Sequence, residues 1–339
     1  MRIPEPKQLP SGKWRIQVMV DNKRVGRTFD SPEEASYWAS GIKTKMKEAE
    51  VAPKNLSVSA AVDRYIESKD SVLSPSTIAG YKKIKSNLME NIGTVKLGDL
   101  TQEKVQRWVN SLSKDKSPKT VANAHGLLSA VLGEYRPSMA LRTTLPQKVK
   151  PSIQIPSEAE IKAILTAAKG TKYELPIILA VWLGLRQSEI LGLTWDCVDG
   201  SVIHIKQAIV MGENGPVEKG TKTYSGTRTI HLSDYIKELL DATPHHGDHI
   251  VRMSGKAIYS GFSRICEKAG VPYFRFHDLR HTNASVMLAS GIPDKYSMKR
   301  MGHATNNMLK TTYQHTIKEK EAEYDQLIDS YFEDLMKPE

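Results

Sequence analysis

The stretch YELPIILAVWLGLRQSEILGLTW, residues 173–195, is the most apolar part of the 339-residue chain. A segment this apolar is typical of an element buried on every side, so it predicts the centre of the largest hydrophobic core. Arg186 follows directly after the apolar run, and a guanidinium in that position needs an anionic partner. Glu189, three residues further on, is the local candidate. Taken alone, the two residues are best interpreted as a structural ion pair of a helix.

Elements on both sides of this stretch complete a large domain, which we place at residues 155–339. A helix starts at Ser157, a favourable capping residue that directly precedes an amphipathic run. Downstream, SVIHIKQAIV (201–210) and TRTIHL (227–232) predict two strands of a long hairpin around the glycine-rich segment 211–226. The rest of this domain, after the second strand, is predicted to be helical. The last helix carries an apolar stripe at Tyr324, Leu327, Ile328, Tyr331 and Leu335.

A proline-containing linker, residues 143–157, separates this domain from a helical region at residues 55–145. Helix start signals at Ser74, Thr101 and Ser117 each precede an amphipathic run. The pattern predicts a four-helix domain, of the size that one hydrophobic core supports.

The first 50 residues predict a small sheet followed by a helix. KWRIQVMV (13–20) and RVGRTF (24–29) alternate as half-buried strands do, and Ser31 begins a helix. Such a sheet can lie in a DNA groove; the alternative is an accessory lobe without that role. Its basic candidates for DNA contact are Arg15, Arg24 and Arg27. The whole chain is therefore predicted to be multidomain and mainly α-helical with small β elements.

The formal net charge of +10 indicates an anionic partner, and its distribution is more informative. Residues 51–150 hold 16 basic residues against 8 acidic ones, whereas residues 319–339 hold 2 against 8. A basic body with an acidic tail fits a nucleic-acid clamp. A solubility charge on solvated helix faces explains the same numbers equally well. Lysines near helix starts are the candidate phosphate contacts: Lys82, Lys83 and Lys119.

Several classes of protein are disfavoured. The chain has no run of 18 apolar residues, and its first residues lack the apolar core of a signal peptide, so we expect a soluble, cytosolic protein. Its two cysteines, Cys197 and Cys266, have no metal-ligand spacing and are expected to be reduced core thiols. No cluster of thiols, histidines or carboxylates predicts a metal site.

Three further segments carry chemically capable residues. Lys222, at the start of the second hairpin strand, is either solvated or a mobile proton donor. His277 and Arg280 lie on one face of a helix start, where anions bind favourably; a capping cluster neutralised by Asp278 is the alternative. In RMGHATNNMLKTTYQHT (300–316), ten residues separate a histidine from a tyrosine. These two can converge only if the chain turns between them, because ten helical residues span about 15 Å.

Together these side chains contain every group that metal-free phosphoryl transfer needs. Two arginines neutralise the phosphate oxygens, a histidine orients or deprotonates, a lysine protonates the leaving oxygen and a tyrosine attacks. The ordered motifs GLRQSE, TKT, HDLRHT and MGH, followed by a tyrosine after ten residues, resemble the tyrosine recombinases, specifically phage and conjugative-transposon integrases.

The resemblance implies a role for each matched residue. It makes Arg186 and Arg280 the phosphate-binding arginines, supported by Glu189. It makes Lys222 the general acid and Tyr313 the nucleophile. His277 and His303 become the two histidines of the pocket. It also implies an arm-type DNA-binding module at residues 1–50, a core-DNA-binding domain at 55–145 and a catalytic domain with a docking tail at 155–339.

The implied function is site-specific integration and excision of a mobile element through a covalent 3′-phosphotyrosyl intermediate and a Holliday junction, without a cofactor. The implied partners are double-stranded DNA with core and arm-type sites, three further copies in a tetramer, and accessory excision or DNA-bending proteins. The implied location is the cytoplasm of a bacterial host, at the nucleoid. Two alternatives remain: DNA relaxation as in type IB topoisomerases, and a non-catalytic DNA-binding protein.

Overall fold

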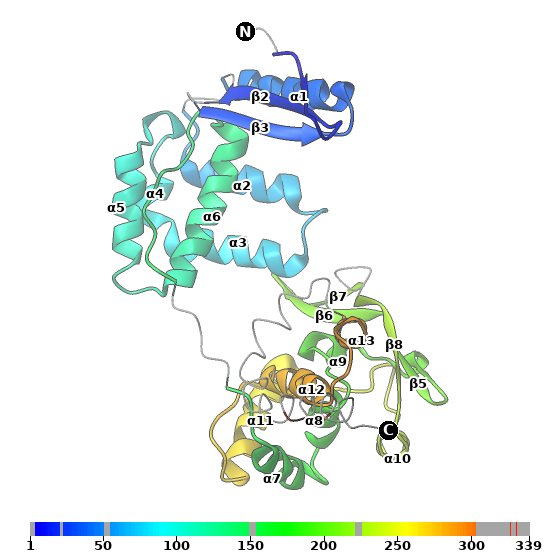
Figure 1. Cartoon of the computed structure of the whole chain (residues 1–339). Helices are drawn as coiled ribbons and strands as arrows, with labels where there is room; N and C mark the ends of the chain where they lie inside the picture. The colour runs from blue at the N-terminus through cyan, green and yellow to red at the C-terminus, as the bar shows by residue number, and fades with distance from the viewer. Residues whose placement is uncertain are drawn as a thin grey trace, which may run out of the picture. The chain divides into compact units, whose positions relative to one another are not determined.

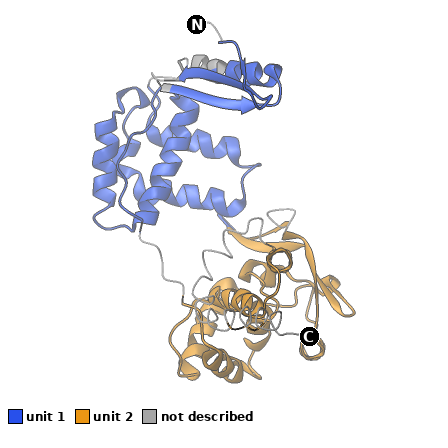
Figure 2. Ribbon diagram, in the orientation of Figure 1, with its two compact units in different colours: residues 1–150, 212–214 blue, residues 151–211, 215–339 orange. Residues whose placement is uncertain are grey.

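The computed structural model describes residues 4–20, 23–50, 55–148, 154–220, 226–302, 326 and 330. The chain divides into two compact units, residues 1–150 with 212–214 and residues 151–211 with 215–339 (Figure 2). The described part is mainly helical and holds three small sheets (Figure 1), which confirms the predicted fold class. Among its helices, none combines the length and apolar character needed to cross a membrane.

The first unit begins with an antiparallel sheet in the order β1-β2-β3, which packs on helix α1. The elements are β1 (Lys7–Gln8), β2 (Trp14–Val20), β3 (Lys23–Phe29) and α1 (Pro32–Glu50). Ile16 and Val18 of β2 are buried with Ala35 and Ala39 of α1, as the alternating pattern predicts. The hydroxyl of Ser31 accepts a hydrogen bond from the backbone N–H of Glu34, so the predicted helix start is confirmed. The short strand β1 was not predicted.

A helical bundle with its own core follows. Its helices are α2 (Val58–Lys69), α3 (Pro75–Leu88), α4 (Glu90–Gly93), α5 (Gln102–Leu112) and α6 (Pro118–Tyr135). Ser74, Thr101 and Ser117 cap α3, α5 and α6 through hydrogen bonds from the third residue of each helix, which confirms the three predicted start signals. The four long helices were predicted, and the one-turn helix α4 was not.

The chain after α6 runs back along α5 in an extended conformation. Gln102 donates to the carbonyl of Ala140 (2.7 Å) and accepts from the backbone N–H of Arg142 (3.0 Å). One turn further on, Gln106 pairs with the N–H (2.9 Å) and the carbonyl (3.0 Å) of Thr144. The two amide side chains thereby substitute for a neighbouring strand. The predicted linker is thus fastened to the bundle over its first residues.

The second unit is an α+β domain. Its helices are α7 (Glu158–Ala168), α8 (Glu174–Val181), α9 (Gln187–Gly192), α10 (Asp234–Asp241), α11 (Gly255–Lys268), α12 (Asp278–Ala289) and α13 (Asp294–Met301). One sheet has the order β4 (Val198–Asp199), β5 (Val202–Ile205) and β8 (Arg228–His231). The strands β6 (Gln207–Gly212) and β7 (Gly215–Gly220) form a separate two-stranded sheet.

Helix α8 lies at the centre of this unit, as its apolar sequence predicts. Residues 174–180 are buried, and α8 contacts α7, α9, α10 and α12. Cys197 and Cys266 are buried free thiols, as expected. The pairing of β5 with β8 confirms the predicted hairpin. The predicted first strand, residues 201–210, is divided between β5 and β6. The glycine-rich segment 211–226, interpreted as a loop, contains the end of β6 and the whole of β7. The predicted apolar stripe of the last helix lies outside the described residues.

Candidate active site

Arg186 and Glu189 form the predicted ion pair at the start of α9. Arg186 Nη1 donates to Glu189 Oε1 at 2.7 Å, and the backbone N–H of Arg186 donates to Oε2 at 2.9 Å. The carboxylate is buried, whereas 35% of the Arg186 side chain remains exposed. One side of the guanidinium is therefore held by the protein while another part faces solvent.

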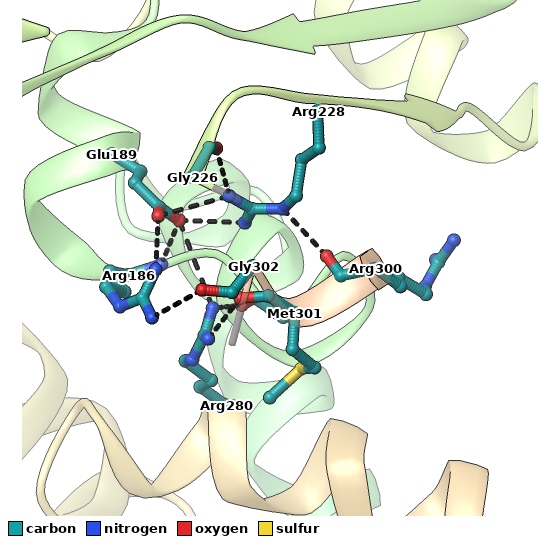
Figure 3. A network of polar contacts seen from close by, with 9 residues as sticks. Arg186, Glu189, Gly226, Arg228, Arg280, Arg300, Met301 and Gly302 are labelled. Carbon is teal, nitrogen blue, oxygen red and sulfur yellow. Dashed lines mark hydrogen bonds and ion pairs between the residues drawn. The ribbon is translucent and has the colours of Figure 1, made fainter. Parts of the chain in front are cut away.

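Glu189 has a second partner that sequence analysis missed. Arg228, the first residue of β8, is buried. It donates to both carboxylate oxygens, from Nη1 to Oε1 at 3.2 Å and from Nη2 to Oε2 at 2.9 Å (Figure 3). Burial alone would raise the pKa of Glu189, but the bonds and charge of Arg228, aided by Arg186, lower it to about 2. Glu189 is therefore ionised at every physiological pH.

The sequence contained a signal that Arg228 is buried and paired. The strand residues Arg228, Thr229, Ile230 and His231 alternate between buried and exposed positions, so an arginine occupies a place that the pattern assigns to an apolar side chain. An inward-facing charge in a half-buried strand is uncommon unless it is paired. That mismatch was the available signal.

Arg280 of α12 completes a group of three arginines around Glu189. Its Nη1 lies 3.9 Å from Glu189 Oε2. The side chain is buried, and its terminal nitrogens donate to the carbonyls of Gly184 and Met301. Arg280 is thus anchored in the protein through both of its terminal nitrogens.

The C-terminal end of α13 supplies carbonyl acceptors to all three arginines. Arg228 Nε donates to the carbonyl of Arg300 at 2.7 Å, Arg280 to that of Met301, and Arg186 Nη2 to that of Gly302 at 3.1 Å (Figure 3). The last carbonyls of a helix lack partners within the helix and carry its partial negative charge. Three cations therefore stabilise the helix end that directly precedes His303 in the sequence.

Two glycines permit this close packing. Gly302 caps α13 in the left-handed conformation, with φ 63° and ψ 44°, which glycine adopts without strain. Gly184, before Arg186, has φ 66°, and a Cβ there would lie 2.8 Å from both Asn283 Oδ1 and Met301 Sδ. A side chain at Gly184 would displace the side chains of Asn283 and Met301, which pack against the turn that precedes Arg186.

His277 lies at the start of α12, directly before the helix. Dehydration by the surrounding protein, together with the nearby His281, Arg280 and Arg186, lowers the pKa of His277 to about 4. His277 is neutral at pH 7 and can accept a proton.

Asp278 does not neutralise Arg280, in contrast to the alternative considered from the sequence. Its buried carboxylate pairs with Arg275, whose Nη2 donates to Oδ1 at 2.7 Å and whose backbone N–H donates to Oδ2 at 2.8 Å. The positive charge of Arg280 is instead balanced near Glu189.

Three of the predicted site residues, Lys222, His303 and Tyr313, lie outside the described residues. The described residues bring together Arg186, Glu189, His277 and Arg280, and add Arg228. Within that same part of the chain there is no group of three or more histidines, cysteines or carboxylates placed to hold a metal ion.

The predicted DNA-contacting arginines of the N-terminal sheet lie on two different faces. Arg15 and Arg24 point away from α1, because their neighbours Ile16 and Val18 are buried against that helix. Arg27 pairs with Ile16 across the sheet and therefore lies on the helix side, exposed beside Phe29. The lysine candidates Lys82, Lys83 and Lys119 are exposed on the helical bundle.

Comparison with protein families gives two matches. A model described as the phage integrase family matches residues 157–320, and a model of the phage integrase N-terminal SAM-like domain matches residues 58–113. Together they cover well over half of the chain, including every motif quoted above. The chain belongs to the phage integrase family of tyrosine recombinases.

Curated relatives of this tyrosine recombinase match it over most of its length. The tyrosine recombinase XerC-like protein of Caldanaerobacter subterraneus subsp. tengcongensis is 26% identical over an alignment of 292 positions that covers 72% of this chain and 75% of the relative. The putative prophage phiRv2 integrase of Mycobacterium tuberculosis is 25% identical over an alignment of 357 positions that covers 94% of this chain and 92% of the relative.

Solved structures show that the recombinase shares its fold with integrases. The Tn1549 transposon integrase in complex with transposon right end DNA matches with a TM-score of 0.65 and 20% identity, covering 80% of this chain and 99% of that one. The lambda integrase tetramer bound to a Holliday junction matches with a TM-score of 0.61 and 17% identity, covering 92% and 95%.

Proposed function

We propose that this site-specific DNA recombinase integrates and excises a mobile element with Tyr313 as its nucleophile. The Tyr313 hydroxyl attacks the scissile phosphorus, and its proton passes to a base, for which neutral His277 is suited. The bond from phosphorus to the 5′ oxygen breaks, and Lys222 protonates that oxygen. A 3′-phosphotyrosyl link and a 5′-hydroxyl result. Attack by a partner strand's hydroxyl reverses these steps.

The convergence of Arg186 and Arg280 carries the proposal. They come from helices α9 and α12, which are far apart in the sequence, and both donate to the end of α13. A single exposed arginine would be compatible with simple DNA binding. Two converging arginines beside a low-pKa histidine are suited to a phosphate whose negative charge increases during reaction.

The charge of the group supports the same chemistry. The guanidinium groups of Arg186, Arg228 and Arg280 surround the ionised carboxylate of Glu189. These four side chains together carry a net charge of about +2. A phosphodiester carries about one negative charge and its pentavalent transition state about two, so the group favours the transition state over the ground state. The energy of the broken bond is retained in the phosphotyrosyl link, so we propose that no cofactor takes part.

We further propose that the enzyme acts as a tetramer on double-stranded DNA, in the nucleoid of a bacterial host. Strand exchange between two duplexes requires four cleavages, hence four protomers. The solved lambda integrase assembly, a tetramer bound to a Holliday junction, supports this number. Residues 1–50 would bind arm-type sites, residues 55–145 the core site, and accessory excision or DNA-bending proteins would set the direction.

The deciding experiment uses a nicked suicide DNA containing the core site, followed by denaturing gel electrophoresis. We expect wild-type protein to give a covalent DNA adduct that protease treatment removes. Binding without an adduct would favour a non-catalytic DNA-binding protein. Adduct formation with relaxation of supercoiled plasmid, but no exchange between two core sites, would favour a topoisomerase.

A truncated chain tests the proposed arm-type module. Deletion of residues 1–50 is expected to preserve cleavage of the core site and to weaken integrative recombination. Equal recombination with and without these residues would exclude the arm-site role. The intact chain, compared on the same plasmids, is the control.

A further inference from the structure

No bond-making or proton-transfer step proposed above uses Arg228 directly, yet its guanidinium group is almost fully engaged. It makes four hydrogen bonds, to both oxygens of Glu189 and to the carbonyls of Gly226 and Arg300 (Figure 3). A guanidinium has five N–H groups in a planar fork. Four of the five are therefore used within the protein, so at most one N–H of Arg228 remains for any other acceptor.

We propose that Arg228 is a positioning residue for strand cleavage: it holds Glu189, and through Glu189 the phosphate-binding Arg186, in the reactive arrangement. The proposal rests on the proposed function of this site. It assigns Arg228 no contact with DNA, and its effect passes entirely through the buried carboxylate and the end of α13.

The first link runs through the carboxylate. Glu189 Oε1 accepts from both Arg186 and Arg228, and Oε2 accepts from Arg228 and from the backbone N–H of Arg186. If Arg228 is removed, Glu189 becomes a buried charge whose counter-ions are Arg186 and, at 3.9 Å, Arg280. Both catalytic arginines are then drawn toward the carboxylate and away from a bound phosphate.

The second link connects three segments of the site. Arg228 begins β8 six residues after Lys222 in the sequence, and its Nε donates to the carbonyl of Arg300, three residues before His303. Its Nη1 also donates to Gly226 within the chain leading to β8. One side chain thus joins the start of β8, the start of α9 and the end of α13.

Lysine cannot reproduce these contacts. Its ammonium is a single point with three donors, whereas the bonds of Arg228 leave the planar fork in three different directions. Arg228→Lys keeps the charge that Glu189 needs for burial, so the domain is expected to fold. The lysine variant cannot hydrogen-bond both the Glu189 carboxylate and the carbonyl of Arg300 at the same time.

The first test compares Arg228→Lys with wild-type protein and with a control, Thr229→Ala. The side chain of Thr229 lies on the opposite face of β8 from that of Arg228. Single-turnover adduct formation on the suicide DNA is measured together with core-site affinity and the melting temperature. We expect Arg228→Lys to cleave at least tenfold more slowly, with affinity within threefold of wild type. Thr229→Ala is expected to cleave like wild type.

The second test asks whether the effect passes through Glu189. In Arg228→Met the carboxylate loses its main partner, and the groups still facing it are Arg186 and Arg280. Adduct formation should therefore decline as the pH falls toward 5, in a range where wild type is constant. Adding Glu189→Gln to Arg228→Met should remove this extra pH dependence. A carbon-13 NMR titration of the Glu189 carboxyl, which requires no reaction, should show a raised pKa in Arg228→Met.

The outcomes separate this proposal from the proposed function. No adduct with wild-type protein refutes the function, while an unchanged Glu189 titration in Arg228→Met refutes the positioning role without reference to activity. If wild type forms the adduct and Arg228→Lys cleaves equally fast, the positioning role is also refuted. The cleavage rate of the Arg228 variants could instead fall only in proportion to the amount of folded protein, with no Glu189-dependent titration. That result would identify Arg228 as a structural residue and overturn the proposal.

Discussion

Arg186 and Arg280 donate to adjacent backbone carbonyls, those of Gly302 and Met301, at the C-terminal end of α13. The two arginines are 94 positions apart in the sequence, and this shared anchor brings them together. Because the same helix end leads directly to His303, the anchor also relates the arginines to the segment that contains Tyr313.

The nucleophile is tested by Tyr313→Phe. Loss of one hydroxyl removes the attacking oxygen but no charge, so DNA binding is expected to remain and the covalent adduct to disappear. Denaturing gels and a filter-binding assay measure the two properties. Tyr296→Phe, at an exposed position on α13, is the matched control and should form the adduct normally. An adduct in Tyr313→Phe would assign the nucleophile to another tyrosine.

The phosphate-binding arginines are tested by Arg186→Ala and Arg280→Ala. One charge-assisted donor at a transition state contributes about 3–4 kcal/mol, so cleavage is expected to slow by about 10²- to 10³-fold. Core-site affinity should decrease far less, because most binding energy comes from other phosphate contacts. Arg264→Ala, on α11, serves as the control for removal of an arginine from the same domain. Equal losses of affinity and rate would indicate a binding role alone.

Glu189→Gln should destabilise the catalytic domain. The substitution leaves Arg228 buried without its counter-ion, and breaking a buried ion pair from one side costs about 3–5 kcal/mol. Thermal and urea unfolding at pH 7 measure the difference. Glu238→Gln, on the exposed side of α10, should stay within about 0.5 kcal/mol of wild type. A stability of Glu189→Gln equal to that of the control would show that the pair contributes little.

His277 predicts a specific dependence of stability on pH. Its pKa is about 4 in the folded protein and about 6.5 in an unfolded chain. Between these values the unfolded state binds the additional proton, so lowering the pH through this window favours unfolding. Wild type should therefore lose more stability between pH 7 and pH 5 than His277→Gln does. Melting temperatures of both proteins at the two pH values test this, and parallel losses would contradict the lowered pKa.

The two faces of the N-terminal sheet predict different effects on DNA binding. Arg15→Ala combined with Arg24→Ala removes two cations from the face opposite α1, whereas Arg27→Ala changes the helix side. If the open face binds phosphates, the double variant should lower the slope of log affinity against log salt by about 1.8, since each contact contributes about 0.9. Arg27→Ala is the control with the smaller effect. Identical slopes would place the contacts elsewhere.

Local structure was largely predictable from the sequence. The starts of α1, α3, α5, α6 and α7 were predicted from capping residues, and each is confirmed by a hydrogen bond to its cap. Such signals are readable because donor and acceptor lie within three or four residues of each other. The ion pair between Arg186 and Glu189 was predictable for the same reason.

Long-range contacts were not predictable in the same way. Arg228 and Glu189 are 39 residues apart, and the carbonyl of Arg300 lies 72 residues beyond Arg228. Strand β7 was missed because its glycines and charged residues are typical of a loop, whereas most of β6 was predicted as a continuation of the strand at 201–210. The attachment of Thr144, at the start of the predicted linker, to Gln106 was not predicted, since nothing in the linker's own residues indicates it.

The sequence by itself determined which reactive side chains the chain possesses and their order, and that order carried the resemblance to integrases. It determined the helix starts as well, because these depend on neighbours along the chain. Only the tertiary structure decided which arginines meet, that a third arginine shares Glu189, and that three successive carbonyls of α13 bind one arginine each. Every residue has a carbonyl, so no sequence pattern distinguishes those three. Their role arises because α13 ends where α9, α12 and β8 pack together.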